Sequence, residues 1–390
     1  MNRLDKFCKR GIVLLITITL AAVLASPTFA ADTSCATKYP IILAHGMGFY
    51  PTDTLPDSFP GIKAALEECG ATVYVTQVEP LGTSAEKGEQ FINGYTWGVA
   101  ETDPDYIAGY DYPETHFPGF NEIKATDGAK KFHIIGHSQG GLYTRWAITM
   151  GGIAQNVASL TTVDSPHLGS QIDDIQVQLG ELMPKQADKL ADAINPYNIE
   201  YIAKNSGKDV TPADVKIKLE ENTADLTSEN MADFNEDVPM PDPKTGHGLG
   251  PNDADVYYQS FSCAYKKYNV FKALQNQMQM LIDLNKDELP ELPDPSDGLA
   301  LAKFIKSSFP DYAAMSLLYG GGQGDGLVQV NDAKLGVFLG VEKGPRSNSD
   351  GLNHFDAVNI DNENNEKWDA ISYYVGLVKD LKRLEIKENM

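Results

Sequence analysis

Short runs of apolar and β-branched residues alternate along the chain with segments whose apolar positions recur at helical spacing. Strands are predicted at residues 39–44, 71–75, 131–135, 159–163 and 315–319, and helices at residues 60–69, 141–150 and 367–384. Strands that alternate with helices predict a mostly parallel sheet with helices on both of its faces. The strands are apolar almost throughout, which indicates that the sheet is buried on both sides.

Two long segments interrupt this alternation. Residues 97–121 are rich in Tyr, Pro, Gly and acidic residues, and they predict a long surface excursion. Residues 170–310 show no clear core-strand pattern. The sequence therefore predicts an insertion over about 171–310 that forms a cap or lid, with a separate domain as the alternative.

The N-terminus has the pattern of a secretory signal peptide. Four basic residues lie within the first ten positions, an uncharged apolar run covers 11–25, and small residues lead to Ala30. This order predicts cleavage after Ala30, with signal peptide 1–30 and a single domain over 31–390. An uncleaved anchor helix is the alternative, because the apolar run approaches the length of a membrane span, although it does not reach it.

The charge of the chain limits its partners. The formal net charge is −22, and the signal segment that would be removed is basic. Nucleic acid and anionic lipid surfaces should repel such a chain, so we expect no nucleic-acid partner. Residues 31–390 contain no other apolar run of membrane-spanning length, so we also expect no stable membrane insertion.

Cys35, Cys69 and Cys263 remain after cleavage, and one disulfide is expected without a choice of pair.

The segment Gly136-His-Ser-Gln-Gly140 lies between a predicted strand and a predicted helix. A Gly-x-Ser-x-Gly turn in this context exposes the serine hydroxyl, because glycine at both ends avoids clashes with the neighbouring backbone. Ser138 is therefore the predicted nucleophile. The oxyanion that such a nucleophile creates needs two N–H donors. Gln139 at the start of the helix is one candidate, and Met47 in His45-Gly-Met-Gly48 is the other.

A serine in such an elbow is followed along the chain by an acid and then by a histidine. Of the seven histidines, three follow Ser138, namely His167, His247 and His354. His354 is late in the chain and precedes the last helix, so it is the predicted base. Asp325, in a glycine-rich loop after the strand predicted at 315–319, is the predicted acid, and Asp164 is the alternative.

Five segments together resemble the proteobacterial triacylglycerol lipases of the Pseudomonas and Burkholderia type. They are residues 39–47, 86–90, 133–141, 324–328 and 353–359, and they occur in the order typical of that family. The resemblance implies an α/β-hydrolase fold (class α/β, with a mostly parallel sheet and a lid). It implies hydrolysis of water-insoluble esters through Ser138, Asp325 and His354. The signal peptide predicts secretion, by way of the periplasm. Many relatives also need a folding chaperone, and the sequence does not show whether this chain does.

The resemblance further implies a structural Ca²⁺ that holds the loop carrying the histidine. In that family two carboxylates and two backbone carbonyls bind the ion, in agreement with calcium's preference for oxygen ligands. Asp356 matches one carboxylate, and the carbonyls fall near Ile360 and Asn364. Asp297 is a candidate for the second carboxylate, which the spacing does not identify. The alternative for Asp356 is an acid beside a helix N-terminus.

The sequence thus predicts a secreted serine ester hydrolase similar to triacylglycerol lipases. Its expected substrate is a lipid or another ester, which an enzyme of this kind can meet at an oil–water interface. A short-chain carboxylesterase or an aliphatic polyester depolymerase would use the same triad. A catalytically inactive binding protein with a hydrolase fold is the alternative from another class. The sequence leaves the acyl-chain length open.

Overall fold

A computed structural model of the chain describes residues 32–48, 58–98, 101–102, 114–174, 177, 202–203, 210–250, 252–265, 323–346, 351–360 and 368–390. The predicted signal peptide and the strand predicted at 315–319 lie outside these residues. Among the residues described, none forms a helix long and apolar enough to cross a bilayer.

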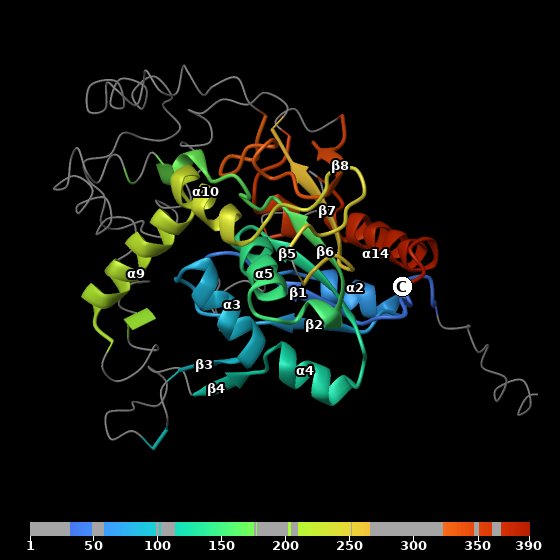
Figure 1. Cartoon of the computed structure of the whole chain (residues 1–390), viewed down its shortest axis with the longest axis horizontal. Helices are drawn as coiled ribbons and strands as arrows, with labels where there is room; N and C mark the ends of the chain where they lie inside the picture. The colour runs from blue at the N-terminus through green and yellow to red at the C-terminus, as the bar shows by residue number, and fades with distance from the viewer. Residues whose placement is uncertain are drawn as a thin grey trace, which may run out of the picture.

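A six-stranded sheet forms the centre of the molecule (Figure 1). Its order is β2-β1-β5-β6-β7-β8, and every neighbouring pair is parallel. The strands are β1 (Ile41–Ala44), β2 (Val73–Thr76), β5 (Phe132–His137), β6 (Val157–Val163), β7 (Tyr257–Cys263) and β8 (Val337–Glu342). Because all pairs are parallel, the carboxyl ends of the strands meet at one edge, where ligands of open α/β sheets bind.

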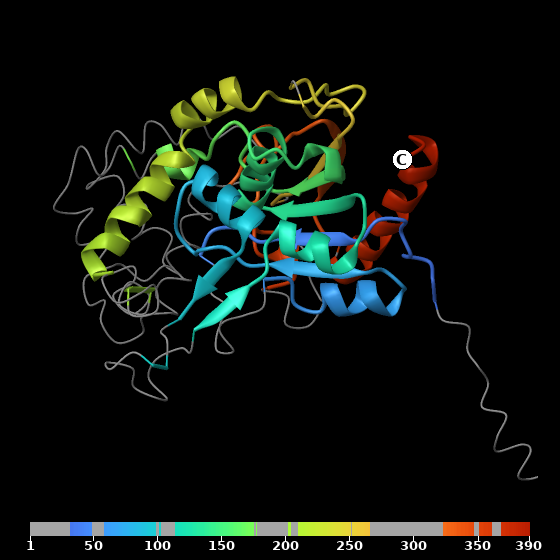
Figure 2. The same ribbon diagram turned by 60° about the horizontal axis from the view of Figure 1, so that its bottom comes forward.

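Helices cover both faces of the sheet, as the sequence predicts. One face carries α2 (Ile62–Glu68) and α14 (Ala370–Lys387), and the other carries α3 (Ser84–Asn93), α4 (Phe120–Asp127) and α5 (Gln139–Thr149) (Figure 2). Strand β1 shows how this works: Ile41 and Leu43 pack into one core, and Ile42 and Ala44 into the other. Successive side chains of a strand point to opposite faces, so a strand between two cores must be apolar throughout.

The remaining described elements lie around this sheet. A two-stranded antiparallel unit, β3 (Tyr95–Trp97) and β4 (Thr115–Phe117), lies at the ends of the predicted surface excursion. A short 3₁₀ turn, η1 (Ala154–Asn156), precedes β6, and another, η2 (Asp356–Val358), follows His354. Helices α9 (Pro212–Asp225) and α10 (Ser228–Asp237) belong to the predicted insertion and lie beside α3 and α5 (Figure 1). Helix α9 begins with a capping box in which Thr211 and Asp214 bond to each other's backbone N–H.

The sequence pattern was wrong about residues 170–310 in one respect. Strand β7 lies inside that range and is an inner strand of the main sheet, so the range is not a single insertion. The strand has no continuous apolar run that would predict it, because several of its buried side chains are polar and hydrogen-bonded. Ser260 Oγ donates to Leu335 O at 2.9 Å, and Gln259 Nε2 donates to Thr161 Oγ1 at 3.0 Å. Buried polar groups with partners cost little, so strand formation tolerates them.

A disulfide links Cys35 to Cys69, and Cys263 is a buried free cysteine. The bridge joins the segment before β1 to the end of α2. The sequence predicted one disulfide without choosing the pair, and the structure identifies the two cysteines.

Candidate active site

Ser138 lies in a strained turn between β5 and α5. Its backbone angles are φ 56° and ψ −131°, a conformation that L residues rarely adopt and that is typical of functional sites. A Cβ on Gly140 would lie 2.3 Å from Ala44 O, and one on Gly136 would lie 2.7 Å from Gly140 C. The prediction that both positions require glycine is confirmed. The Ser138 N–H donates to Val163 O at 2.8 Å, which fixes the turn to β6.

Asp325 and His354 meet at the carboxyl edge of the sheet. His354 Nδ1 lies 2.6 Å from Asp325 Oδ2, and both side chains are buried. The other carboxylate oxygen of Asp325 accepts from Leu327 N at 2.9 Å and from Val328 N at 2.8 Å. The His354 N–H donates to Asp325 O at 3.1 Å, so backbone and side chains hold the two loops together. The arrangement leaves His354 Nε2 as the ring nitrogen available to act as a base.

His137 connects this pair to the elbow. It directly precedes Ser138, its ring centroid is 4.6 Å from that of His354, and its Nε2–H donates to His354 O at 3.1 Å. Burial lowers the pKa of His137 well below its usual range, so the ring is neutral and adds no charge beside the base. The structure contains no hydrogen bond from Ser138 to His354; such bonds often form only when substrate binds.

Of the two predicted oxyanion donors, Gln139 follows Ser138 directly, and Met47 follows a glycine that lies against Ser138. Gln139 begins α5, where backbone N–H groups have no acceptor within the helix. Gly46, next to Met47, is so close to the nucleophile that a Cβ there would lie 2.7 Å from Ser138 Cβ. Burial lowers the pKa of His45 to about 3, and its Nε2 accepts from Val78 N at 3.2 Å. The neutral imidazole therefore anchors the loop that carries Met47 to the segment after β2.

A buried polar cluster, which the sequence did not predict, holds the side chain of Gln139. Lys87 Nζ donates to Gln139 Oε1 at 2.7 Å and to Pro80 O at 3.0 Å, and Lys87 is fully buried. Asn222 Nδ2 donates to the same Gln139 oxygen at 3.0 Å. Burial lowers the pKa of Lys87 to about 7. Lys87 lies in one of the segments that carry the family resemblance, but nothing in its spacing indicated this contact.

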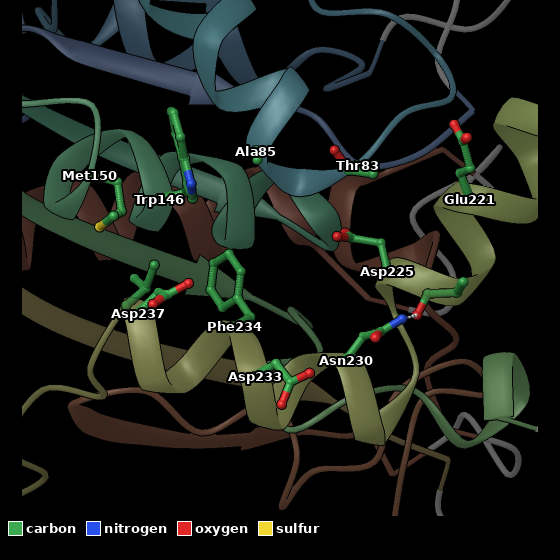
Figure 3. Close-up of a pocket in the computed structure, with 12 residues that line it drawn as sticks. Thr83, Ala85, Trp146, Met150, Glu221, Asp225, Asn230, Asp233, Phe234 and Asp237 are labelled. Carbon is green, nitrogen blue, oxygen red and sulfur yellow. Dashed lines mark hydrogen bonds between the residues drawn. The ribbon is translucent and has the colours of Figure 1, made fainter.

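A cavity of about 540 Å³ lies between α3, α5, α9 and α10 (Figure 3). Trp146 of α5 and Phe234 of α10 face it, together with several acidic side chains of α9 and α10. Ser138, Asp325 and His354 do not line it. Asp225 is the link to the elbow, because it lines the cavity and lies 3.4 Å from Gln139 Nε2.

Two of the four predicted calcium ligands belong to one loop after His354. Asp356 is buried at the start of η2, and its Oδ2 accepts from Asn353 N at 2.8 Å. The Ile360 N–H donates to Phe355 O at 3.1 Å, which holds Ile360 at the end of the turn that contains Asp356. Asn364 and Asp297 lie outside the described residues. An oxygen donor set of this kind suits Ca²⁺ chemically.

The alternative candidates have other partners. His167 is buried with Nδ1 3.1 Å from Arg145 Nη1 and Nε2 3.0 Å from Thr162 Oγ1. His247 packs edge-on against Tyr257. Asp164, the alternative acid, lies close to the predicted acid and base. A carboxylate oxygen of Asp164, one of Asp325 and a ring nitrogen of His354 lie within 4.8 Å of one another.

Comparisons with known proteins agree with this fold. The family model described as palmitoyl protein thioesterase matches residues 40–211. A triacylglycerol lipase of Vibrio cholerae is 29% identical over 313 residues, which cover 75% of this chain and 87% of the relative. A triacylglycerol lipase of Pseudomonas fragi is 25% identical over 292 residues, which cover 72% of this chain and 87% of the relative. Lipase 1 of Pelosinus fermentans superposes with a TM-score of 0.50 at 17% identity, over 89% of this chain and 99% of that one, and it has the same fold.

Proposed function

We propose that this ester hydrolase with the α/β-hydrolase fold is a secreted triacylglycerol lipase that forms an acyl-enzyme on Ser138. The observation that carries the proposal is the hydrogen-bonded pair of His354 and Asp325, which lies beside a serine held at positive φ. The similarity of the chain to triacylglycerol lipases over most of its length supports a triacylglycerol as the substrate.

In the proposed reaction, Ser138 Oγ attacks the ester carbonyl while His354 Nε2 accepts its proton. Asp325 holds the imidazole in position and stabilises its positive charge. The backbone N–H groups of Gln139 and Met47 donate to the oxyanion of the tetrahedral intermediate, and the N-terminus of α5 favours the negative charge. His354 then gives the proton to the departing alcohol. A water molecule, activated by the same histidine, hydrolyses the acyl-enzyme and restores Ser138.

The test is a substrate series on the purified mature chain. Hydrolysis of p-nitrophenyl esters from acetate to palmitate, and of an emulsified long-chain triacylglycerol, should be measured beside a palmitoyl thioester. A lipase cleaves the emulsion and the long-chain esters. Activity confined to acetate and butyrate would show a short-chain carboxylesterase, and release of soluble monomers from a polyester film would show a depolymerase. Preference for the thioester would follow the palmitoyl thioesterase family model instead.

The control is Ser138→Ala. It removes one oxygen at the elbow, so the fold should persist while hydrolysis of every ester is lost. Retained activity in this variant would contradict the assignment of the nucleophile. No turnover by the unaltered chain, and no labelling by a fluorophosphonate, would favour the inactive binding protein.

Secretion is part of the proposal, and the Cys35–Cys69 disulfide supports it, because such bonds persist mainly in oxidising compartments. Mass spectrometry of the N-terminus of the exported protein should find Ala31. An N-terminus at Met1 in the membrane fraction would instead indicate an uncleaved anchor.

We also propose a structural Ca²⁺ held by Asp356 and the carbonyls of Ile360 and Asn364, with Asp297 as a candidate for the second carboxylate. The ion would fix the loop that follows His354 and would take no part in the bond-making steps. A chelator should lower the melting temperature, added Ca²⁺ should restore it, and Asp356→Asn should make the protein insensitive to both. A melting temperature that ignores the chelator would count against the ion.

A further inference from the structure

Asp164 is a second acid at the base of the site. It follows the last residue of β6, its side chain is fully buried, and its φ is +50°. A non-glycine residue in this conformation is strained, and strain of this kind persists where the surroundings require it. The mechanism above gives Asp164 no role.

One oxygen of Asp164 has clear partners in β7. Its Oδ1 accepts from Ser262 Oγ at 2.6 Å and from Cys263 N at 2.8 Å. Its Oδ2 is buried, and no described donor reaches it. A carboxylate oxygen without a donor is costly in the interior, whereas a protonated oxygen needs only an acceptor.

The available acceptor is Asp325. A carboxylate oxygen of Asp164 and one of Asp325 lie within 4.8 Å of each other. Two ionised carboxylates at that separation in the interior repel each other, so the buried pair keeps one proton. Asp325 already accepts from Leu327 N, Val328 N and His354, whereas Asp164 Oδ2 has no described donor. Burial, and then the charge of Asp325, raise the pKa of Asp164 well above its usual range. The proton therefore belongs to Asp164.

We propose that Asp164 is a positioning residue for the catalytic acid: its neutral carboxyl group donates a hydrogen bond from Oδ2 to the carboxylate of Asp325 and keeps that carboxylate directed at His354. The site then has a chain of contacts from β7 to the base, running Ser262, Asp164, Asp325 and His354. The pair carries a single negative charge, which matches the single positive charge that His354 gains during catalysis. This inference rests on the proposed function of the triad.

The geometry separates the effects of two substitutions. Asp164→Asn keeps an acceptor for Ser262 and Cys263 and places N–H donors toward Asp325. Asp164→Gly removes both groups but suits the positive φ, so it should fold without backbone strain. With a soluble p-nitrophenyl ester, we expect kcat of the Asp164→Asn variant to fall by about threefold or less. In the Asp164→Gly variant kcat should fall by about tenfold or more while KM changes little, because the base is mispositioned after substrate has bound.

Two kinetic outcomes would overturn the proposal. Asp164→Gly with kcat within threefold of the unaltered enzyme would show that Asp325 needs no support. Asp164→Asn as slow as Asp164→Gly would show that the charge of Asp164 matters, and hence that it is ionised. Neither result depends on a loss of folding, because melting temperatures are measured on the same samples.

A spectroscopic measurement tests the proton directly and does not require activity. The infrared difference spectrum between the unaltered protein and Asp164→Asn should contain the C=O band of a protonated carboxyl group. It should be recorded above pH 8, where Asp173, whose pKa burial raises to about 7, is mostly ionised. The absence of the band would overturn the proposal. If the band is present but Ser138→Ala leaves ester hydrolysis unchanged, the proposed function fails while the protonated acid remains established.

Discussion

The two halves of the candidate site are built in different ways. The elbow half, Ser138 with its oxyanion donors, is held by backbone geometry: a positive φ, close-packed glycines and the start of α5. The half that carries Asp325 and His354 is held by buried polar side chains from loops far apart in the sequence. The nucleophile is therefore positioned locally, and its base depends on tertiary contacts. Changes to the first half should act through sterics, and changes to the second half through charge and hydrogen bonding.

The largest effect should come from the base half. Asp325→Asn keeps the size of the side chain but removes the charge that orients and stabilises the imidazole of His354. By analogy with other Ser-His-Asp sites, kcat should fall about 10,000-fold while the melting temperature changes little. Steady-state kinetics with a soluble ester measure this. A loss of less than tenfold would indicate that Asp164 takes over as the acid, and the double variant with Asp164→Asn would then be inactive.

A smaller effect should come from a steric change in the elbow half. In Gly46→Ala the new methyl group would lie 2.7 Å from Ser138 Cβ and 3.1 Å from Ser138 Oγ, so the nucleophile or the Met47 loop must move. We expect kcat to fall about 100-fold, as expected for a displacement near 1 Å. Gly48→Ala is the matched control for the loop, because a Cβ there meets nothing within 4 Å, although its φ of +80° adds strain. Equal losses in both variants would show that the loop, and not the contact with Ser138, is responsible.

Lys87→Met tests the support beneath the oxyanion donor and should have a milder effect. It removes the donor to Gln139 Oε1, but Asn222 still contacts that oxygen. We expect about a tenfold loss in kcat with KM nearly constant, because the oxyanion hole is used in the transition state. Lys218→Met is the control, since Lys218 is partly exposed and pairs with Glu79 at 2.7 Å. If both variants lose activity equally, the effect of Lys87 is not specific to Gln139.

The remaining prediction concerns stability rather than rate. The pKa of Asp164 is raised in the folded state by burial and by Asp325, while the unfolded chain has the ordinary value near 4. The folded state therefore holds a proton that the unfolded state releases, and its contribution to stability is lost as the pH rises above about 4. Asp164→Asn does not titrate, so its stability relative to the unaltered protein should increase with pH, by up to about 1.4 kcal/mol per pH unit. Urea unfolding at pH 5 and pH 8 measures this, and a difference independent of pH would contradict the shift.

Local patterns predicted the elbow half of the site and most of the fold, whereas Asp325 and His354 were predicted from their order along the chain. The strand, the glycine spacing and the helix around Ser138 follow from neighbours in the sequence, and the structure has each of them. Strands β7 and β8 were missed, because Ser260 and Ser262 are polar inside the sheet and β8 is only partly buried at the edge. Lys87 and Asp164 were not predicted as supports, because their partners come from segments distant in sequence. Buried polar contacts between distant segments leave no periodic trace in a sequence.

The most direct test of the account is to identify the residue that a fluorophosphonate modifies and to follow ester hydrolysis in the same sample. We expect one adduct per chain, on the peptide that contains Ser138, with hydrolysis lost in proportion to labelling. We also expect Asp325→Asn and His354→Ala to be labelled far more slowly, although their Ser138 is intact. A label on another residue, or hydrolysis that continues with Ser138 fully modified, would contradict the assignment of the nucleophile.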